Sequence, residues 1–141
     1  MSLATFDPFY PIVDDVAWIA RLVPLGVKLV QLRIKERDED DIRRQLREAR
    51  KLCAGRGAQL VVNDYWQMAI EEGCGFVHLG REDLDGADIP AIHGAGIRIG
   101  ISTHDHAELD RALSFDPDYV ALGPIYPTRL KAMRFGPQGL E

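Results

Sequence analysis

Short apolar runs alternate with stretches of helical periodicity along this chain, and the alternation predicts its fold. Six runs have the length and composition of buried strands, and apolar residues recur at helical spacing between them. Strands that alternate with helices in this way form a parallel sheet. The expected strands cover residues 9–13, 28–35, 59–63, 76–80, 98–102 and 119–125, and the expected helices lie near residues 16–25, 39–54, 68–73 and 87–93 and after residue 105.

Acidic residues come before several of these helices, where they can cap the free N–H groups of the first turn. Asp14 and Asp15 precede the first helix, and an acidic turn at residues 38–41 opens the second. Asp105 and Glu108 have the spacing of an N-cap and its partner three residues later. The second helix should end at Gly55 and bury the stripe Ile42, Leu46, Ala49 and Cys53.

Polar residues follow most of the apolar runs at their carboxyl ends, which is typical of a TIM (β/α)₈ barrel with its active site on that face. We expect a single domain over residues 1–141, because the β/α alternation is continuous. A complete barrel has eight strands and about 250 residues. We therefore expect about six β/α units here, with the last two absent, and exposed sheet edges that favour a homo-oligomer.

The second expected strand alternates between a polar and an apolar face. Gln31, Arg33 and Lys35 share one face, which would point into the barrel and towards its mouth. Arg offers a rigid fork to phosphate oxygens and Lys a compact cation, so this face suggests an anchor for phosphate or pyrophosphate. A solvated edge strand is the alternative.

Carboxylates follow the third and fourth strands. Asn63 and Asp64 close the third, and Glu82 and Asp83 come after the fourth. Hard oxygen ligands from neighbouring strand ends suit Mg²⁺, with phosphate oxygens and water completing its shell. As alternatives, Asp64 could cap the following helix and Asp83 could only stabilise a turn.

Other polar residues near strand ends carry weaker signals. Ser102 and Thr103 could cap the last helix. His104 and His106 are expected to be exposed at a helix start, and we do not predict a zinc site there. His78 is expected to be a hydrogen-bonded barrel residue. The exit at residues 123–128, with Thr128 and Lys131, could hold a second part of an anionic substrate.

Composition narrows the function further. The net charge of -5 and pI near 5.3 argue against nucleic acid or an anionic membrane as a partner. The sequence has no long apolar span and no basic-then-apolar start typical of a secretory signal. Cys53 and Cys74 are expected to be reduced, which favours the cytoplasm.

Taken together, these motifs resemble the thiamine-phosphate synthase family between Tyr10 and Gly139. The resemblance implies a transferase that joins hydroxymethylpyrimidine pyrophosphate to hydroxyethylthiazole phosphate, releases pyrophosphate and uses Mg²⁺. It implies that Arg33, Lys35, Ser102 and Lys131 are catalytic and that Asp64 and Asp83 bind the metal. The residues implied to contact the substrates are Gln31, Arg33, Lys35, Asn63, Ser102, Thr128 and Lys131.

The chain departs from the family pattern in two places. Leu130 stands where the family usually has a second hydroxyl, two residues after Thr128. The family also continues through two further strands that hold the thiazole phosphate, so we expect the isolated chain to lack that part of the site. Two alternatives therefore stay open: a silent pyrimidine-pyrophosphate-binding fragment, and a related thiazole tautomerase.

Overall fold

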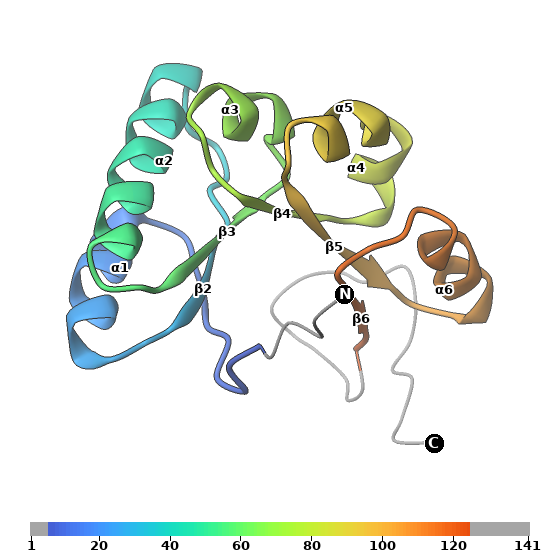
Figure 1. The fold of residues 1–141 in the computed structure, drawn as a ribbon, viewed down its shortest axis with the longest axis horizontal. Coiled ribbons are helices and arrows are strands. Elements are labelled where there is room, and N and C mark those ends of the chain that lie inside the picture. Colours follow the sequence, from blue (N-terminus) through green and yellow to red (C-terminus); the bar gives the residue numbers. More distant parts are fainter. Residues whose placement is uncertain (1–5, 125–141) are drawn as a thin grey trace.

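A computed structural model describes residues 6–124 of the 141-residue chain, and these residues form one curved parallel sheet covered by helices. The sheet follows chain order: β1 (Ile12–Val13), β2 (Leu29–Leu32), β3 (Gln59–Asn63), β4 (Phe76–Leu79), β5 (Arg98–Thr103) and β6 (Tyr119–Leu122). The helices are α1 (Val16–Leu22), the 3₁₀ helix η1 (Val23–Leu25), α2 (Glu39–Ala54), α3 (Trp66–Glu71), α4 (Arg81–Asp85), α5 (Ile89–Gly94) and α6 (His106–Leu113). The helices lie along the convex side of the sheet, which curls like half a barrel (Figure 1). The prediction of an α/β fold with six parallel strands is therefore confirmed.

Alternation along the strands divides the buried side chains between two faces. On β2, Val30 and Leu32 join the large core between sheet and helices, whereas Leu29 faces the inside of the curve. Leu29 packs there with Val61 of β3 and Phe76 of β4. The inner face also carries the polar side chains that concern the function.

The predicted helix caps are present. Asp15 accepts a hydrogen bond from the N–H of Ala17 at 2.8 Å, and Asp38 accepts one from Asp41 at the same distance. Asp105 caps α6 through the N–H of Glu108. The expected stripe of α2 is buried in full, over Ile42, Leu46, Ala49 and Cys53.

The first two strands are shorter than the sequence suggested. β1 begins at Ile12 rather than residue 9, because Pro11 has no N–H to donate and β1 is paired, among residues 6–124, only with β2. β2 ends at Leu32 rather than Lys35, although the Arg33 N–H still donates to the Val13 carbonyl at 2.8 Å. Arg33 and Lys35 thus lie in the loop beyond the strand.

The segment between β4 and β5 contains two short helices where the sequence suggested one. α4 begins directly after Gly80, whose N–H donates to the Asp83 carboxylate at 3.0 Å. α5 follows and is capped by Asp88. Because α4 has only five residues, it carries no recognisable apolar period.

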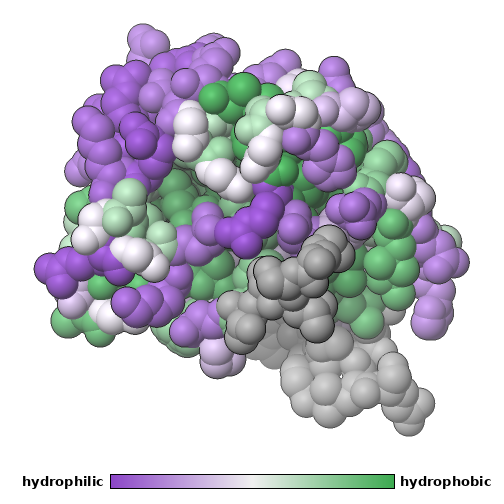
Figure 2. Space-filling model, in the orientation of Figure 1, coloured by the Kyte–Doolittle hydropathy of each residue, from purple (hydrophilic) through white to green (hydrophobic). Residues whose placement is uncertain are grey.

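Charged side chains cover the outer surface of α2, where Figure 2 shows hydrophilic residues gathered. Arg43 pairs with Glu71 and Arg47 with Glu72, so ion pairs connect α2 with α3. In the range 6–124, no helix has the length and apolar content needed to cross a bilayer.

Candidate functional site

The candidate site lies at the carboxyl edge of the sheet, as the barrel pattern predicted. Arg33 and Lys35 follow β2, Asn63 ends β3 and Asp64 comes next. Asp83 lies on α4 directly after β4, and Ser102 lies near the end of β5. Since all strands are parallel, residues from four separate segments reach the same edge.

Asp64 and Asp83 lie close enough for their charges to interact. The pKa of Asp64 is raised, first by burial and then by the charge of Asp83, whereas Lys35 acts in the opposite direction. Two carboxylates that repel each other in a partly buried place are stabilised by a cation. The pair therefore could hold a divalent metal.

Of the alternative roles considered for these two carboxylates, that of Asp83 is observed and that of Asp64 is not. Asp64 does not cap α3, because the N-cap is Tyr65 and no side chain caps that helix. Asp83 does stabilise a turn, since it accepts the Gly80 N–H. One oxygen of Asp83 makes this bond, so a structural role and a ligand role are compatible there.

Tyr65 belongs to the same region, although sequence reasoning did not find it. Its hydroxyl donates to the Ile34 carbonyl at 2.8 Å and so fastens the loop carrying Arg33 and Lys35 to the start of α3. Its pKa is raised by burial and then by Asp64 and Asp83, and Arg33 opposes this shift. No signal in the sequence points to Tyr65, because a left-handed residue (φ 32°) at this position follows no local pattern.

Gln31 and Asn63 are both buried on the inner face of the sheet. Gln31 is 2% exposed, and its Nε2 donates to the Tyr10 hydroxyl at 2.9 Å. Asn63 is 7% exposed and pairs in register with His78 of β4. These amides therefore lie on the strands, and the charged residues Arg33, Lys35 and Asp64 follow them at the carboxyl ends.

His78 is a hydrogen-bonded inner residue, as expected. Its Nδ1 lies 2.6 Å from the Tyr119 hydroxyl and its Nε2 lies 2.6 Å from Ser102 Oγ. Burial lowers the pKa of His78 to about 4, so its ring is neutral at pH 7.

The alternative role considered for Ser102 and Thr103, capping the last helix, is not observed. Asp105 is the N-cap, and Thr103 donates instead to the Ala121 carbonyl at 2.8 Å. β5 continues through Thr103, so both hydroxyls belong to the strand rather than to the start of α6. Ser102 is thereby turned to the inner face.

The two histidines beside α6 differ from each other. His106 is exposed as expected, but His104 is partly buried and its Nδ1 lies 2.8 Å from Glu108. Between residues 6 and 124, no three His, Cys, Asp or Glu side chains are grouped in a way that could hold a metal ion. Thr128, Leu130 and Lys131 lie outside the described residues.

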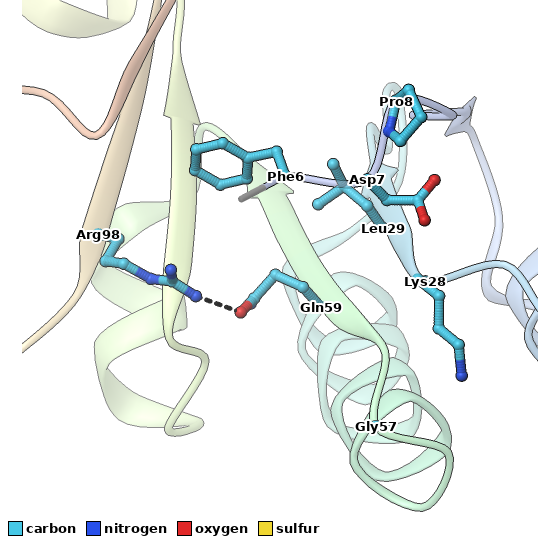
Figure 3. Close-up of a pocket in the computed structure, with 8 residues that line it drawn as sticks. All are labelled: Phe6, Asp7, Pro8, Lys28, Leu29, Gly57, Gln59 and Arg98. Atoms are coloured by element: carbon cyan, nitrogen blue, oxygen red, sulfur yellow. Dashed lines mark hydrogen bonds between the residues drawn. The ribbon is translucent and has the colours of Figure 1, made fainter. Parts of the chain in front are cut away.

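Two hollows in the surface differ in their relation to this edge. One of about 460 Å³ lies at the opposite edge, where Leu29, Gln59 and Arg98 begin their strands (Figure 3). Arg98 donates there to Gln59 and stacks on Phe76. A second hollow, of about 370 Å³, includes Arg33 and Asp14 and adjoins the candidate site.

Fold and site together define an α/β protein of the TIM-like class, with cations and carboxylates collected at the carboxyl ends of its strands. The chain belongs to the family described as thiamine monophosphate synthase, which matches residues 9–141. Its relatives include thiamine-phosphate synthases of Rhizobium etli, 59% identical over 135 residues, and of Enterobacter sp., 51% identical over 132 residues. These matches cover 96% and 94% of this chain.

A solved structure supports the same fold. Thiamine phosphate pyrophosphorylase from Pyrococcus furiosus superposes with a TM-score of 0.74 at 26% identity, over 84% of this chain. The chain spans 61% of that protein, and 66% and 63% of the Rhizobium and Enterobacter relatives.

Proposed function

We propose that this chain contributes to a thiamine-phosphate synthase reaction, in which hydroxymethylpyrimidine pyrophosphate and hydroxyethylthiazole phosphate form thiamine phosphate and pyrophosphate. The observation that carries the proposal is that the charges of Asp83 and Lys35 both act on the Asp64 carboxyl at one edge of the sheet. A phosphate site needs cations, and a metal-assisted one also needs carboxylates. Family membership supplies the substrates.

Each residue has a role in this proposal. Arg33 and Lys35 bind the pyrophosphate oxygens, and the buried amides of Gln31 and Asn63 orient the pyrimidine. Ser102 donates a hydrogen bond to the substrate. Thr128 and Lys131, outside the described residues, complete the proposed set.

The carboxylate pair fits Mg²⁺ in its chemistry. Mg²⁺ is commonly bound by one or two carboxylates together with substrate phosphates and water. Asp64 and Asp83 provide two hard oxygen donors, and burial followed by the charge of Asp83 raises the pKa of Asp64, so a cation beside the pair would stabilise its charged form. When bound, Mg²⁺ would neutralise charge on the departing pyrophosphate.

The chain's own residues then have one main task, which is to stabilise a leaving anion. Loss of pyrophosphate from a benzylic-type carbon leaves a pyrimidine cation, which the thiazole nitrogen attacks. Arg33 and Lys35 supply preorganised positive charge where the negative charge develops. The thiazole supplies the attacking atom, so no protein nucleophile is needed, and the buried thiols of Cys53 and Cys74 have raised pKa values of about 11.

We further propose a cytoplasmic protein that assembles with copies of itself. Both cysteines are free thiols, which suits a reducing compartment. Ile12 at one edge strand and Leu122 at the other are 59% and 49% exposed, which favours self-association.

Two measurements test the proposal. The 141-residue chain should bind hydroxymethylpyrimidine pyrophosphate by calorimetry, more tightly with Mg²⁺ than without. A chimaera, in which this chain continues into the unmatched part of the Rhizobium etli relative, should form thiamine phosphate from both substrates. Failure of the chimaera to turn over, with binding intact, would favour a ligand-binding role. Absence of binding would contradict the proposed site.

A further inference from the structure

Five side chains form a continuous line of hydrogen bonds across the inner face of the sheet. We call this line the relay; in order, it consists of Gln31, Tyr10, Tyr119, His78 and Ser102. The Tyr10 and Tyr119 hydroxyls lie 2.7 Å apart, and both contacts of the His78 ring measure 2.6 Å. The relay connects Gln31 on β2 with Ser102 on β5, two residues of the proposed substrate site.

Tyr119 is the central member, and its ring is held from several sides. It stacks on His78 with ring centroids 5.6 Å apart, and Tyr10 meets it edge-on at 6.0 Å. The ring also occupies the space beside Gly100, where an added Cβ would lie 2.1 Å from Tyr119 Cζ. The position of the Tyr119 hydroxyl is thus determined by packing.

The hydrogens of the relay can be assigned by counting donors. The Gln31 amide donates to Tyr10, so the single Tyr10 hydrogen has the Tyr119 oxygen as its acceptor. Tyr119 can then donate only to His78 Nδ1. In the reverse order, the Tyr10 hydrogen would have no acceptor among residues 6–124, at a cost in this partly buried position.

We propose that the relay fixes His78 as the Nε2–H tautomer, so that His78 donates to Ser102 and leaves the Ser102 hydrogen for a substrate oxygen. The inference rests on the proposed function for the identity of that substrate. With the opposite tautomer, Ser102 would donate to His78 and could only accept from a ligand. Tyr119 and His78 are therefore positioning residues for Ser102.

The tautomer can be read without any ligand. Long-range ¹H–¹⁵N spectra of the histidine-labelled chain, taken in solution or in the solid state if it associates, should show a protonated Nε2 and an unprotonated Nδ1 for His78. Tyr119→Phe should reduce this preference. Tyr65→Phe, which removes a hydroxyl outside the relay, should leave the His78 signals unchanged. A protonated Nδ1 in the wild-type chain would overturn the inference, whatever the chain binds.

A double-mutant cycle tests the connection to the substrate. Ser102→Ala should weaken binding of hydroxymethylpyrimidine pyrophosphate about tenfold, and Tyr119→Phe several-fold. The double variant should bind no more weakly than Ser102→Ala alone, because Tyr119 acts through Ser102. Additive losses would overturn the positioning role. Absence of any binding by a wild-type chain with the expected tautomer would count against the proposed function instead.

Discussion

Asp64 combines an unusual backbone with an unusual charge environment. It has a φ of 61°, and its N–H donates to the His78 carbonyl at 2.8 Å, so the backbone continues the pairing of β3 with β4. Its carboxylate is partly buried near Asp83. The charged carboxylate of Asp64 does not stabilise the folded state. This supports a role for Asp64 in binding rather than in folding.

We predict that Asp64→Asn stabilises the metal-free chain by less than about 1 kcal/mol at pH 7, because the site is partly open to solvent. Asn tolerates positive φ, so the backbone should be unaffected. The pKa of Asp64 is raised above 3.8, so its charged form opposes folding and wild-type stability falls as pH rises through that pKa. The gain from Asp64→Asn should therefore be present at pH 7 and vanish in acid, as urea unfolding at several pH values can measure.

Asp83→Asn is the matched variant for a test of the metal site. An amide oxygen at this position can still accept the Gly80 N–H. Both variants should lose the Mg²⁺ enhancement of pyrimidine-pyrophosphate binding. Unchanged Mg²⁺ dependence in both would show that the metal is not bound there.

Arg33→Ala should weaken binding of hydroxymethylpyrimidine pyrophosphate about tenfold or more, since a hydrogen bond to a charged group contributes roughly 1.5–3 kcal/mol. Binding of the unphosphorylated pyrimidine should change much less. Calorimetry with both ligands on the same variant makes the comparison. Equal weakening of the two would indicate lost packing rather than lost phosphate recognition.

Among the elements, β5 has little space for a side chain at Gly100 on its inner face. Gly100 pairs in register with both His78 of β4 and Tyr119 of β6. The Tyr119 ring lies over it, so any side chain at this position competes with the ring for space. Glycine weakens an isolated strand, but here it permits the aromatic packing that positions the relay.

Gly100→Ala should destabilise the chain by about 1–3 kcal/mol, which is usual for overpacking. The displaced ring should also weaken the relay, so pyrimidine-pyrophosphate binding should fall together with stability. Gly75→Ala is the control, because a Cβ there would meet nothing within 4 Å. Thermal unfolding of the two variants tests the difference, and equal effects would contradict the packing argument.

At the scale of the whole molecule, the described sheet has two edges. β1 pairs only with β2 and β6 only with β5, and an apolar side chain is exposed on each edge strand, Ile12 at 59% on β1 and Leu122 at 49% on β6. Unpaired strand edges with exposed apolar groups favour pairing with another chain.

We therefore predict that the isolated 141-residue chain associates or aggregates, and that it has no synthase activity alone. Light scattering and a turnover assay on this chain test both parts. The chimaera serves as the comparison, because it adds the part of the Rhizobium relative that this chain does not match. An active, well-folded monomer of 141 residues would contradict the prediction.

The sequence by itself determined the β/α alternation, the helix caps and the strand edge at which polar residues collect. These are local properties, since side-chain periodicity and capping depend on residues a few positions apart. β3 was predicted with its observed bounds, and Asp15, Asp38 and Asp105 cap the expected helices.

Only the tertiary structure decided where β1 begins and β2 ends, that α4 exists, and what surrounds each polar group. It brought Tyr65 to Ile34, Tyr119 to His78, and His78 to Ser102. Contacts of this kind join residues up to 109 positions apart, as Tyr10 and Tyr119 are. They depend on strand register and on the volume left by a glycine, which no local pattern encodes.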